Sequence, residues 1–353
     1  MTPFTYVEVG SVKEALEAFH GGGDGRSKWI AGGTNLVDLM KENVERPMRL
    51  IDLNALDLHG IEPAADGGLM LGALARNAAT AYNDTVRRRY PLLNAALLAG
   101  ASPQIRNMAT NGGNLLQRTR CVYFYDVGTP CTKRQPGAGC SAIGGLTRQH
   151  AVLGASDACI ATHPSDMCVA LAALEAKVHV QSRRGSRTIA FADFHRLPGE
   201  RPDQNNTLAP GELVTHIELP PAAQYEAHSA YLKVRDRASY AFALVSVAAA
   251  LDLDPQGLVR SARIALGGVA HKPWRVLEAE AVLAGKPPIA AHFNAAADVL
   301  LRGARSQGDN AFKLVMARRA IVRALETATA GTQAHSQDPN DGPGRPDTKE
   351  QHP

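Results

Sequence analysis

The chain has 353 residues, 45% of them hydrophobic and 20% charged, and its formal net charge is +4. That length and composition are typical of a globular protein with two or three domains. The basic residues are scattered and form no long Lys/Arg run, so we expect no nucleic acid as a partner. No apolar run is long enough to cross a bilayer, and the first residues lack the basic stretch and apolar core of a signal peptide. We therefore expect neither membrane insertion nor an export signal of the chain's own.

Residues 1–57 predict a first lobe of alternating strands and helices. Ser11 and Glu14 have the spacing of a capping box, and the apolar residues that follow fall on one helical face. A short strand near residues 29–31 runs into a glycine-rich turn, which leads to a short helix and a returning strand. The turn and its flanks consist of Ile30, Ala31, Gly32, Gly33, Thr34, Asn35 and Leu36.

Residues 58–221 predict a second lobe. A strand at 69–73 precedes helices at 77–83 and 91–99 and a second glycine-rich turn, which contains Thr110, Gly112, Gly113 and Asn114. A long irregular segment follows, and Ser165 then caps a helix at 166–175. Further strands are expected at 177–180, 187–190 and 213–219, and Pro220-Pro221 marks the end of the lobe.

Residues 222–330 predict a smaller C-terminal domain. It should contain three strands, at 230–234, 244–253 and 259–266, and then three helices, at 273–284, 290–303 and 311–327. Residues 331–353 are polar and rich in Pro, Gly, Asp and Gln. Such a tail cannot bury enough apolar surface to become ordered, so we expect it to be disordered. The whole chain is predicted to be of the α+β class.

The two glycine-rich turns predict a phosphate-bearing cofactor. Glycines allow backbone N–H groups to approach an anion closely, and Thr34 and Asn35 add side-chain donors. One such turn is explained equally well as a plain tight turn, but two in one chain favour a nucleotide-type cofactor held from both sides. Neither turn has the spacing of a Rossmann fingerprint or a P-loop, so those two classes of site are not expected.

Four of the five cysteines, Cys121, Cys131, Cys140 and Cys159, fall within forty residues of each other. None of the intervals is Cys-x-x-Cys, so the ligands to any metal would come from a long irregular loop, residues 118–160. Arg118, Arg120 and Lys133 make this segment cationic, which suits a negatively charged cluster. We favour a [4Fe–4S] cluster, with structural zinc and scattered structural cysteines as the alternatives. The fifth cysteine, Cys168, is most simply a small buried hydrophobe.

Taken together, these segments resemble the FAD-binding medium subunits of molybdenum hydroxylases, the family of xanthine dehydrogenases, carbon monoxide dehydrogenases and aldehyde oxidoreductases. The resemblance extends from Phe4 to about Leu325 and includes the segments 31–36, 50–54, 105–114, 165–166 and 231–235. Most members lack the cysteine segment. It is similar to that of the flavin subunits of bacterial periplasmic aldehyde oxidoreductases, which hold an additional [4Fe–4S] cluster, and 4-hydroxybenzoyl-CoA reductases also have an extra cluster.

The resemblance implies a two-lobed FAD-binding fold of the PCMH type, followed by a smaller α+β domain with a three-stranded sheet and helices. Residues 30–36 would hold the FAD pyrophosphate, with Thr110 to Asn114 as the second loop. Asp166 would hydrogen-bond the cofactor, and Lys233 would lie near the isoalloxazine ring, where a cation stabilises the reduced flavin. The cysteines at 121, 131, 140 and 159 would ligate the cluster.

The resemblance also implies partners. A large subunit with the molybdenum cofactor would oxidise an aldehyde, and a small subunit with two [2Fe–2S] clusters would deliver the electrons to FAD in this chain, which would pass them to an external acceptor. Such a heterotrimer could work in the periplasm after export with a signal-bearing partner, or in the cytoplasm. Two rival interpretations remain: a stand-alone FAD-dependent oxidoreductase and a non-enzymatic, zinc-stabilised scaffold subunit.

Overall fold

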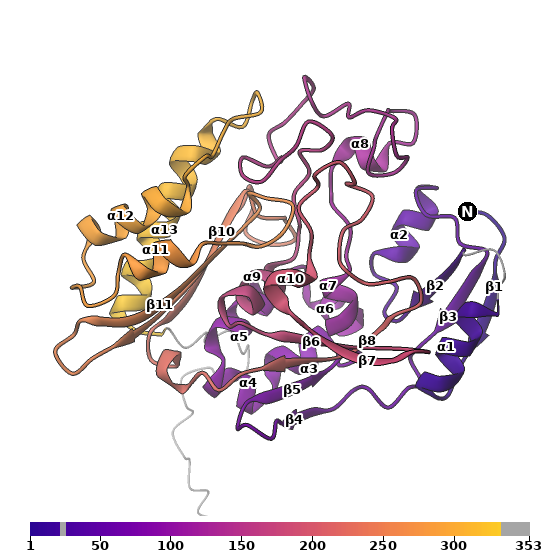
Figure 1. The fold of residues 1–353 in the computed structure, drawn as a ribbon, viewed down its shortest axis with the longest axis horizontal. Coiled ribbons are helices and arrows are strands. Elements are labelled where there is room, and N and C mark those ends of the chain that lie inside the picture. The colour runs from indigo at the N-terminus through magenta and orange to yellow at the C-terminus, as the bar shows by residue number, and fades with distance from the viewer. Residues whose placement is uncertain (22–25, 333–353) are drawn as a thin grey trace, which may run out of the picture.

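The structure is a computed structural model that describes residues 1–21 and 26–332. Lobe 1 (residues 1–57) is a three-stranded parallel sheet of β1 (Thr5–Glu8), β2 (Ser27–Ile30) and β3 (Arg49–Asp52), with β3 in the middle. Helices α1 (Val12–His20) and α2 (Leu36–Lys41) connect the strands. Ser11 caps α1 by accepting a hydrogen bond from the Glu14 amide at 3.2 Å, as predicted. Figure 1 shows this lobe in indigo at one end of the molecule.

Lobe 2 (residues 58–221) is built on a five-stranded antiparallel sheet with the order β4-β5-β8-β6-β7. The strands are β4 (Ile61–Pro63), β5 (Leu69–Gly72), β6 (Lys177–Ser182), β7 (Gly185–Ala190) and β8 (Leu213–Leu219). Its helices are α3 (Asn77–Tyr82), α4 (Asp84–Arg89), α5 (Pro91–Ala99), α6 (Pro103–Met108), α7 (Asn111–Leu115), α8 (Val122–Tyr125), α9 (Asp166–Ala173) and α10 (Phe191–Phe194). The prediction missed β4, α4, α6, α8 and α10, which are too short to leave a periodic pattern.

The C-terminal domain has a sheet of four strands, ordered β12-β11-β10-β9. These are β9 (Ser229–Val234), β10 (Val245–Leu253), β11 (Val259–Gly267) and β12 (Trp274–Arg275), preceded by the single turn η1 (Ala223–Tyr225). Helices α11 (Leu277–Ala281), α12 (Ala290–Leu300) and α13 (Phe312–Ala330) follow. The expected three-stranded sheet and the helix at 273–284 are therefore wrong in detail. The residues after Pro273 pair with β11 before a much shorter helix begins.

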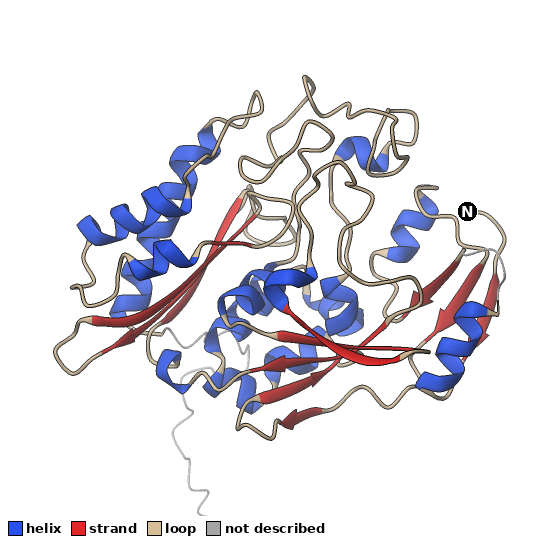
Figure 2. Cartoon of the chain, viewed as in Figure 1, coloured by secondary structure: helices blue, strands red, loops and turns tan. Residues whose placement is uncertain are grey.

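The C-terminal sheet is covered on both faces, which explains why β10 is almost wholly buried. Val247 and Leu251 belong to a core shared with α12 and α13. Ala248 and Ala250, on the opposite face, belong to the core of lobe 2 with residues of α5 and α9. Small side chains on that face let the two domains approach closely. Figure 2 shows the helices on either side of this sheet.

The cysteine segment (residues 118–160) forms long loops with only α8 as regular helix, and it lies above the junction of the lobes in Figure 1. Leu39 of α2, Phe124 and Cys131 form a small buried cluster that attaches this segment to lobe 1. Within the described residues, no helix has both the length and the apolar character required to cross a membrane. The predicted tail falls outside the described residues from position 333 onward.

Candidate functional site

A cleft of about 1480 Å³ runs between the two lobes. All of residues 30–36 line it, and so do Thr110, Gly112, Gly113, Asn114 and Asp166. The structure therefore brings the two glycine-rich segments into one cavity, although they are far apart in the sequence. The volume exceeds the roughly 300–1,000 Å³ of pockets for drug-sized ligands and suits a larger ligand such as a dinucleotide.

The first glycine-rich segment presents free backbone donors to this cleft. Within the described residues, the amides from Gly32 to Leu36 make no hydrogen bond. Gly32 passes so close to the end of α6 that a Cβ atom would lie 1.9 Å from the Met108 carbonyl oxygen, and Gly33 has a φ of 69°. The side chain of Asn54 holds the Ala31 carbonyl at 3.1 Å. Five unsatisfied amides on a rigid backbone are the arrangement that binds a phosphate oxygen.

The second glycine-rich segment forms the start of a short helix rather than the turn that the sequence predicts. Thr110 caps the short helix α7, and its hydroxyl accepts from the Gly113 amide at 3.2 Å. The Gly112 amide donates to the Ala73 carbonyl at 2.8 Å, and the Asn114 amide to the Thr110 carbonyl at 2.8 Å. These amides are used within the fold, so this segment forms a wall of the cleft rather than a second cradle of amides.

A buried network of amide side chains supports that wall, and sequence reasoning missed it. The Asn77 side chain donates to Asn111 at 3.0 Å, and Asn111 donates to Thr80 at 2.9 Å. Asn114 donates to Asn77 at 2.7 Å and accepts from the Ser165 hydroxyl at 2.6 Å. The sequence signal that could have revealed it is the presence of polar residues such as Asn77 and Thr80 at helical positions that are otherwise apolar. Satisfied networks of this kind fix one arrangement of the helices.

Asp166, at the start of α9, lies on the cleft but is also tied to the C-terminal domain. Its two carboxylate oxygens accept from the Tyr231 hydroxyl at 2.7 Å and from Lys233 Nζ at 2.8 Å. Lys233 also donates to the Ala99 carbonyl at 3.0 Å. Burial and the nearby Asp166 charge raise the pKa of Tyr231 well above its usual value. Lys233 itself does not line the cleft and stands behind Asp166.

Replacing Lys233 with methionine is expected to lower the free energy of unfolding by about 3–5 kcal/mol, because a buried carboxylate would lose its ion pair. The side chains of Lys233 and Asp166 are only 3% and 7% exposed. Urea denaturation of the flavin-free chain measures the effect. Arg235→Met is the matched control, since Arg235 donates to the same Ala99 carbonyl but pairs with no carboxylate there. Equal losses of unfolding free energy in the two variants would show that the Lys233–Asp166 ion pair does not stabilise the fold.

The four cysteines of the loop segment are all free thiols in the structure. Cys131 and Cys140 face each other in a short β-bridge. His150 Nε2 lies 3.1 Å from the Cys121 sulfur, and the Ala161 amide donates to the Cys159 sulfur at 3.5 Å. Burial raises the pKa of Cys121 to about 12, so this thiol stays protonated unless a cation binds it.

Lys133 adds a buried positive charge beside these thiols. Its ammonium donates to the Pro202 carbonyl at 2.9 Å and to Asn205, and no carboxylate pairs with it within the described residues. Burial lowers the pKa of Lys133 to about 7, while the charges of Cys159, Cys131 and Cys121 act in the opposite direction. Arg118 connects this segment to the cleft, because its amide donates to the Asn35 side chain at 2.8 Å.

Among the described residues, one set of possible ligands lies within 4.8 Å of one another: His163, Cys168 and His195. His195 donates to the Leu115 carbonyl at 2.8 Å, as structural histidines commonly do. No three of the four loop cysteines meet that limit in the part of the chain described. Two sulfurs on one zinc ion are at most about 4.6 Å apart, so the thiols are spread too widely for a single zinc.

Two family models match the chain. Residues 2–222 match the FAD binding domain in molybdopterin dehydrogenase, and residues 229–328 match the CO dehydrogenase flavoprotein C-terminal domain. Together they cover nearly all of the described chain. The matches agree with the two-lobed α+β fold followed by a C-terminal domain.

Similar proteins carry related names. The aldehyde oxidoreductase FAD-binding subunit PaoB of Escherichia coli is 51% identical over 332 residues, covering 94% of this chain and 99% of that protein. The glyceraldehyde dehydrogenase medium chain of Sulfolobus acidocaldarius is 31% identical, covering 80% and 82%. A reconstituted CO dehydrogenase from Oligotropha carboxidovorans superposes with a TM-score of 0.72 at 25% identity, covering 94% and 99%.

Proposed function

This chain belongs to the FAD-binding subunits of the molybdenum hydroxylase family, and we propose that it is the FAD- and [4Fe–4S]-containing electron-transfer subunit of a molybdenum-dependent aldehyde oxidoreductase. One observation carries the proposal. The cysteine segment packs directly on the glycine-rich segment of the cleft, through the 2.8 Å hydrogen bond from the Arg118 amide to Asn35. A flavin site and a cluster site would thus be neighbours in one chain.

The residues around the cleft fit FAD. The free amides from Gly32 to Leu36 would hold the pyrophosphate, and the Arg120 side chain on the cleft wall would offset its charge. Asp166 accepts from Lys233 at 2.8 Å and keeps lone pairs for one further donor from the cofactor. FAD, when bound, supplies two-electron chemistry with an isoalloxazine ring that also exchanges single electrons with iron–sulfur centres.

The cysteine segment fits a [4Fe–4S] cluster better than zinc. The four thiols form no disulfide, and no three of their sulfurs lie within 4.8 Å of one another in the described chain, which favours a multi-iron cluster over one zinc ion. Lys133 would offset the negative charge of four thiolates, which explains a buried ammonium without a carboxylate partner. The N–H donors of His150 and Ala161 would stabilise the sulfur charge on Cys121 and Cys159.

The names of the relatives support further subunits. They are called FAD-binding subunit and medium chain, which implies that those proteins work with other subunits. In our proposal, a large subunit with the molybdenum cofactor carries out the oxidation of the aldehyde. A small subunit with two [2Fe–2S] clusters passes the electrons to this chain, completing a heterotrimer, and an external acceptor receives them.

The cofactor and metal content of the purified chain tests the proposal directly. The chain is purified with the products of neighbouring genes and then separated from them, and its absorption spectrum, flavin, iron, acid-labile sulfide and zinc are measured. We expect one FAD and one [4Fe–4S] cluster per chain and no aldehyde turnover without the partners. FAD without iron would remove the cluster from the proposal. Zinc with neither FAD nor iron would overturn it, and turnover by the isolated chain would favour a stand-alone enzyme.

A further inference from the structure

One wall of the cleft is a segment without regular structure, residues 203–212, which precedes β8. Its first half is held by backbone hydrogen bonds from the Arg196 amide to the Asn205 carbonyl and from the Thr207 amide to the Phe194 carbonyl, both 3.0 Å long. Its second half has no such bonds to a neighbouring strand within the described residues and turns at Gly211, whose φ is 82°. Yet this wall faces the strand β2 of lobe 1, whose Trp29 lines the same cleft. What holds the segment in place therefore decides the width of the cleft at this end.

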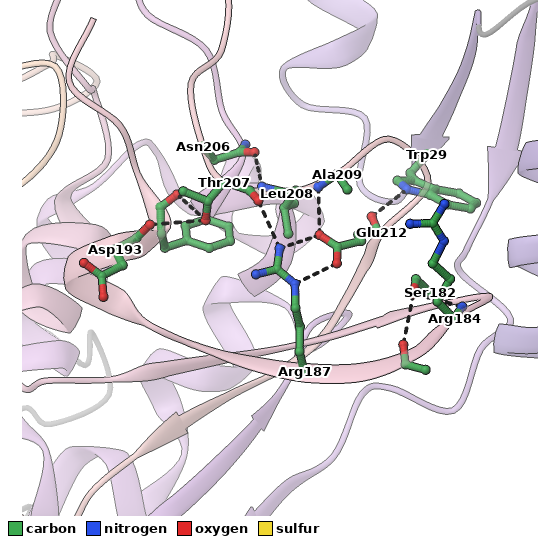
Figure 3. Close-up of polar contacts among 12 residues, drawn as sticks. Trp29, Ser182, Arg184, Arg187, Asp193, Asn206, Thr207, Leu208, Ala209 and Glu212 are labelled. Carbon is green, nitrogen blue, oxygen red and sulfur yellow. Dashed lines mark hydrogen bonds and ion pairs between the residues drawn. The ribbon is translucent and has the colours of Figure 1, made fainter. Parts of the chain in front are cut away.

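Arg187 of β7 holds the second half of the segment, at Thr207 and at Glu212, from outside the cleft. Its guanidinium donates twice to the Glu212 carboxylate, each bond 2.7 Å long, and once to the Thr207 carbonyl at 3.0 Å. Glu212 also accepts from the Ala209 amide at 2.8 Å, which closes the intervening turn. Figure 3 shows Arg187 reaching from its strand toward Glu212 and Thr207.

The same residue pair reaches across to lobe 1. The Trp29 indole N–H donates to the Glu212 backbone carbonyl at 3.3 Å (Figure 3). Glu212 therefore connects the wall both to β2, through its carbonyl, and to β7, through its carboxylate. The Glu212 side chain is only 9% exposed, and the Arg187 hydrogen bonds are the first cause of its lowered pKa. The pair therefore stays charged through the neutral range, and it combines bidentate geometry with a buried acceptor.

We propose that Arg187 is a positioning residue for FAD: through Glu212 it fixes the 203–212 wall against Trp29 and so sets the cleft in its binding shape. The inference rests on the proposed function, in which FAD occupies this cleft. Arg187 does not line the cleft, so it would not contact a cofactor bound there. Arg187 would act by preorganisation. If the 203–212 wall had to become ordered when FAD binds, that ordering would lower the affinity for FAD.

The test uses the full chain after removal of its flavin. We expect Arg187→Ala to weaken FAD binding about tenfold, as the loss of one charge-assisted pair at a half-exposed position would do. Arg187→Lys keeps the positive charge but not the bidentate geometry of the guanidinium. Its FAD affinity should therefore lie between those of Arg187→Ala and the wild type. Arg183→Ala is the matched control, since Arg183 lies in the same hairpin, is exposed and forms no hydrogen bond or ion pair in the described structure.

A second readout separates positioning from general damage. Trp29 and Trp274 are the two tryptophans, so a Trp274→Phe background leaves Trp29 as the reporter of the wall. Without FAD, Arg187→Ala should shift Trp29 emission to longer wavelength while the iron content of the chain stays unchanged. If Arg187→Ala fails to fold, Glu212→Gln replaces it, because it keeps the shape of the side chain and removes its charge.

The outcomes distinguish this inference from the proposed function. Weakened FAD binding with shifted Trp29 emission, in Arg187→Ala or Glu212→Gln but not in Arg183→Ala, supports the positioning role. FAD affinity equal to that of Arg183→Ala overturns it while leaving the flavin site intact. A wild-type chain that binds no FAD would contradict the proposed function itself. FAD binding by the wild type is measured before any variant is made.

Discussion

Gly32→Ala is expected to weaken FAD binding on the order of 100-fold, which is the upper range for forcing a methyl group into a close-packed site. The added Cβ would lie 1.9 Å from the Met108 carbonyl oxygen and 2.7 Å from its carbon. Both are backbone atoms at the end of α6, so no side-chain rotation relieves the contact. The glycine-rich segment must move away from α6, and its row of free amides moves with it.

Titration of the flavin-free variant with FAD, followed by flavin fluorescence, measures this loss. Gly10→Ala is the matched control in the same lobe, since a Cβ there would meet only the flexible Glu14 carboxylate at 3.6 Å. The iron content should not change in either variant, because the cysteine segment is also attached to lobe 1 by the packing of Phe124 and Cys131 against Leu39. Undiminished FAD affinity in Gly32→Ala would show that the pyrophosphate is held elsewhere.

The first glycine-rich segment could be predicted from the sequence because its information is local. A short strand, adjacent glycines and a following helix are all contained in residues 29–41, and the structure has each of them. The same holds for the long C-terminal helix α13, whose apolar period is sustained over its length. The α+β class and the family follow from such segments, and the family models confirm both.

The second segment shows where local information misleads. Thr110-Asn111-Gly112-Gly113 is typical of a turn, but Thr110 can also cap a helix, and a Cβ at Gly112 would lie only 3.1 Å from the Ala73 Cβ. The glycine serves packing between elements that are far apart in the sequence. In the same way, the predicted helix at 273–284 lost its first turn because Trp274 and Arg275 pair with β11.

The contacts that shape the cleft are mostly long-range and carry no sequence pattern. Trp29 and Glu212 are 183 residues apart, and Asp166 and Lys233 are 67 apart. Arg187 looks like any exposed strand residue until its partners are seen. The resemblance supplied Asp166 and Lys233 as candidates, but the placement of Lys233 behind the carboxylate, tied to Ala99, emerges only from the folded chain.

Cys131→Ala is expected to abolish the [4Fe–4S] cluster, leaving FAD in place. A cubane needs four protein ligands, and Cys131 is buried at 7% exposure, so no solvent-exposed group can substitute for it. Iron and acid-labile sulfide should fall to background while the flavin content remains that of the wild type. Cys168→Ala is the matched control, because Cys168 is also buried but lies in α9, outside the cysteine segment.

Losing the cluster should also loosen the segment that surrounds it. Lys133 would keep its buried ammonium without the thiolates that offset it. Burial is the largest cause of its lowered pKa, about 7, and the cysteine charges oppose that shift. The 118–160 loops have little regular structure of their own, so the cluster would be their main source of order. Limited proteolysis should then cut Cys131→Ala within residues 118–160 and spare Cys168→Ala. Full iron content in Cys131→Ala would rule out Cys131 as a ligand. Resistance to proteolysis after iron loss would mean that packing against Leu39 and Phe124 orders the loops without a cluster.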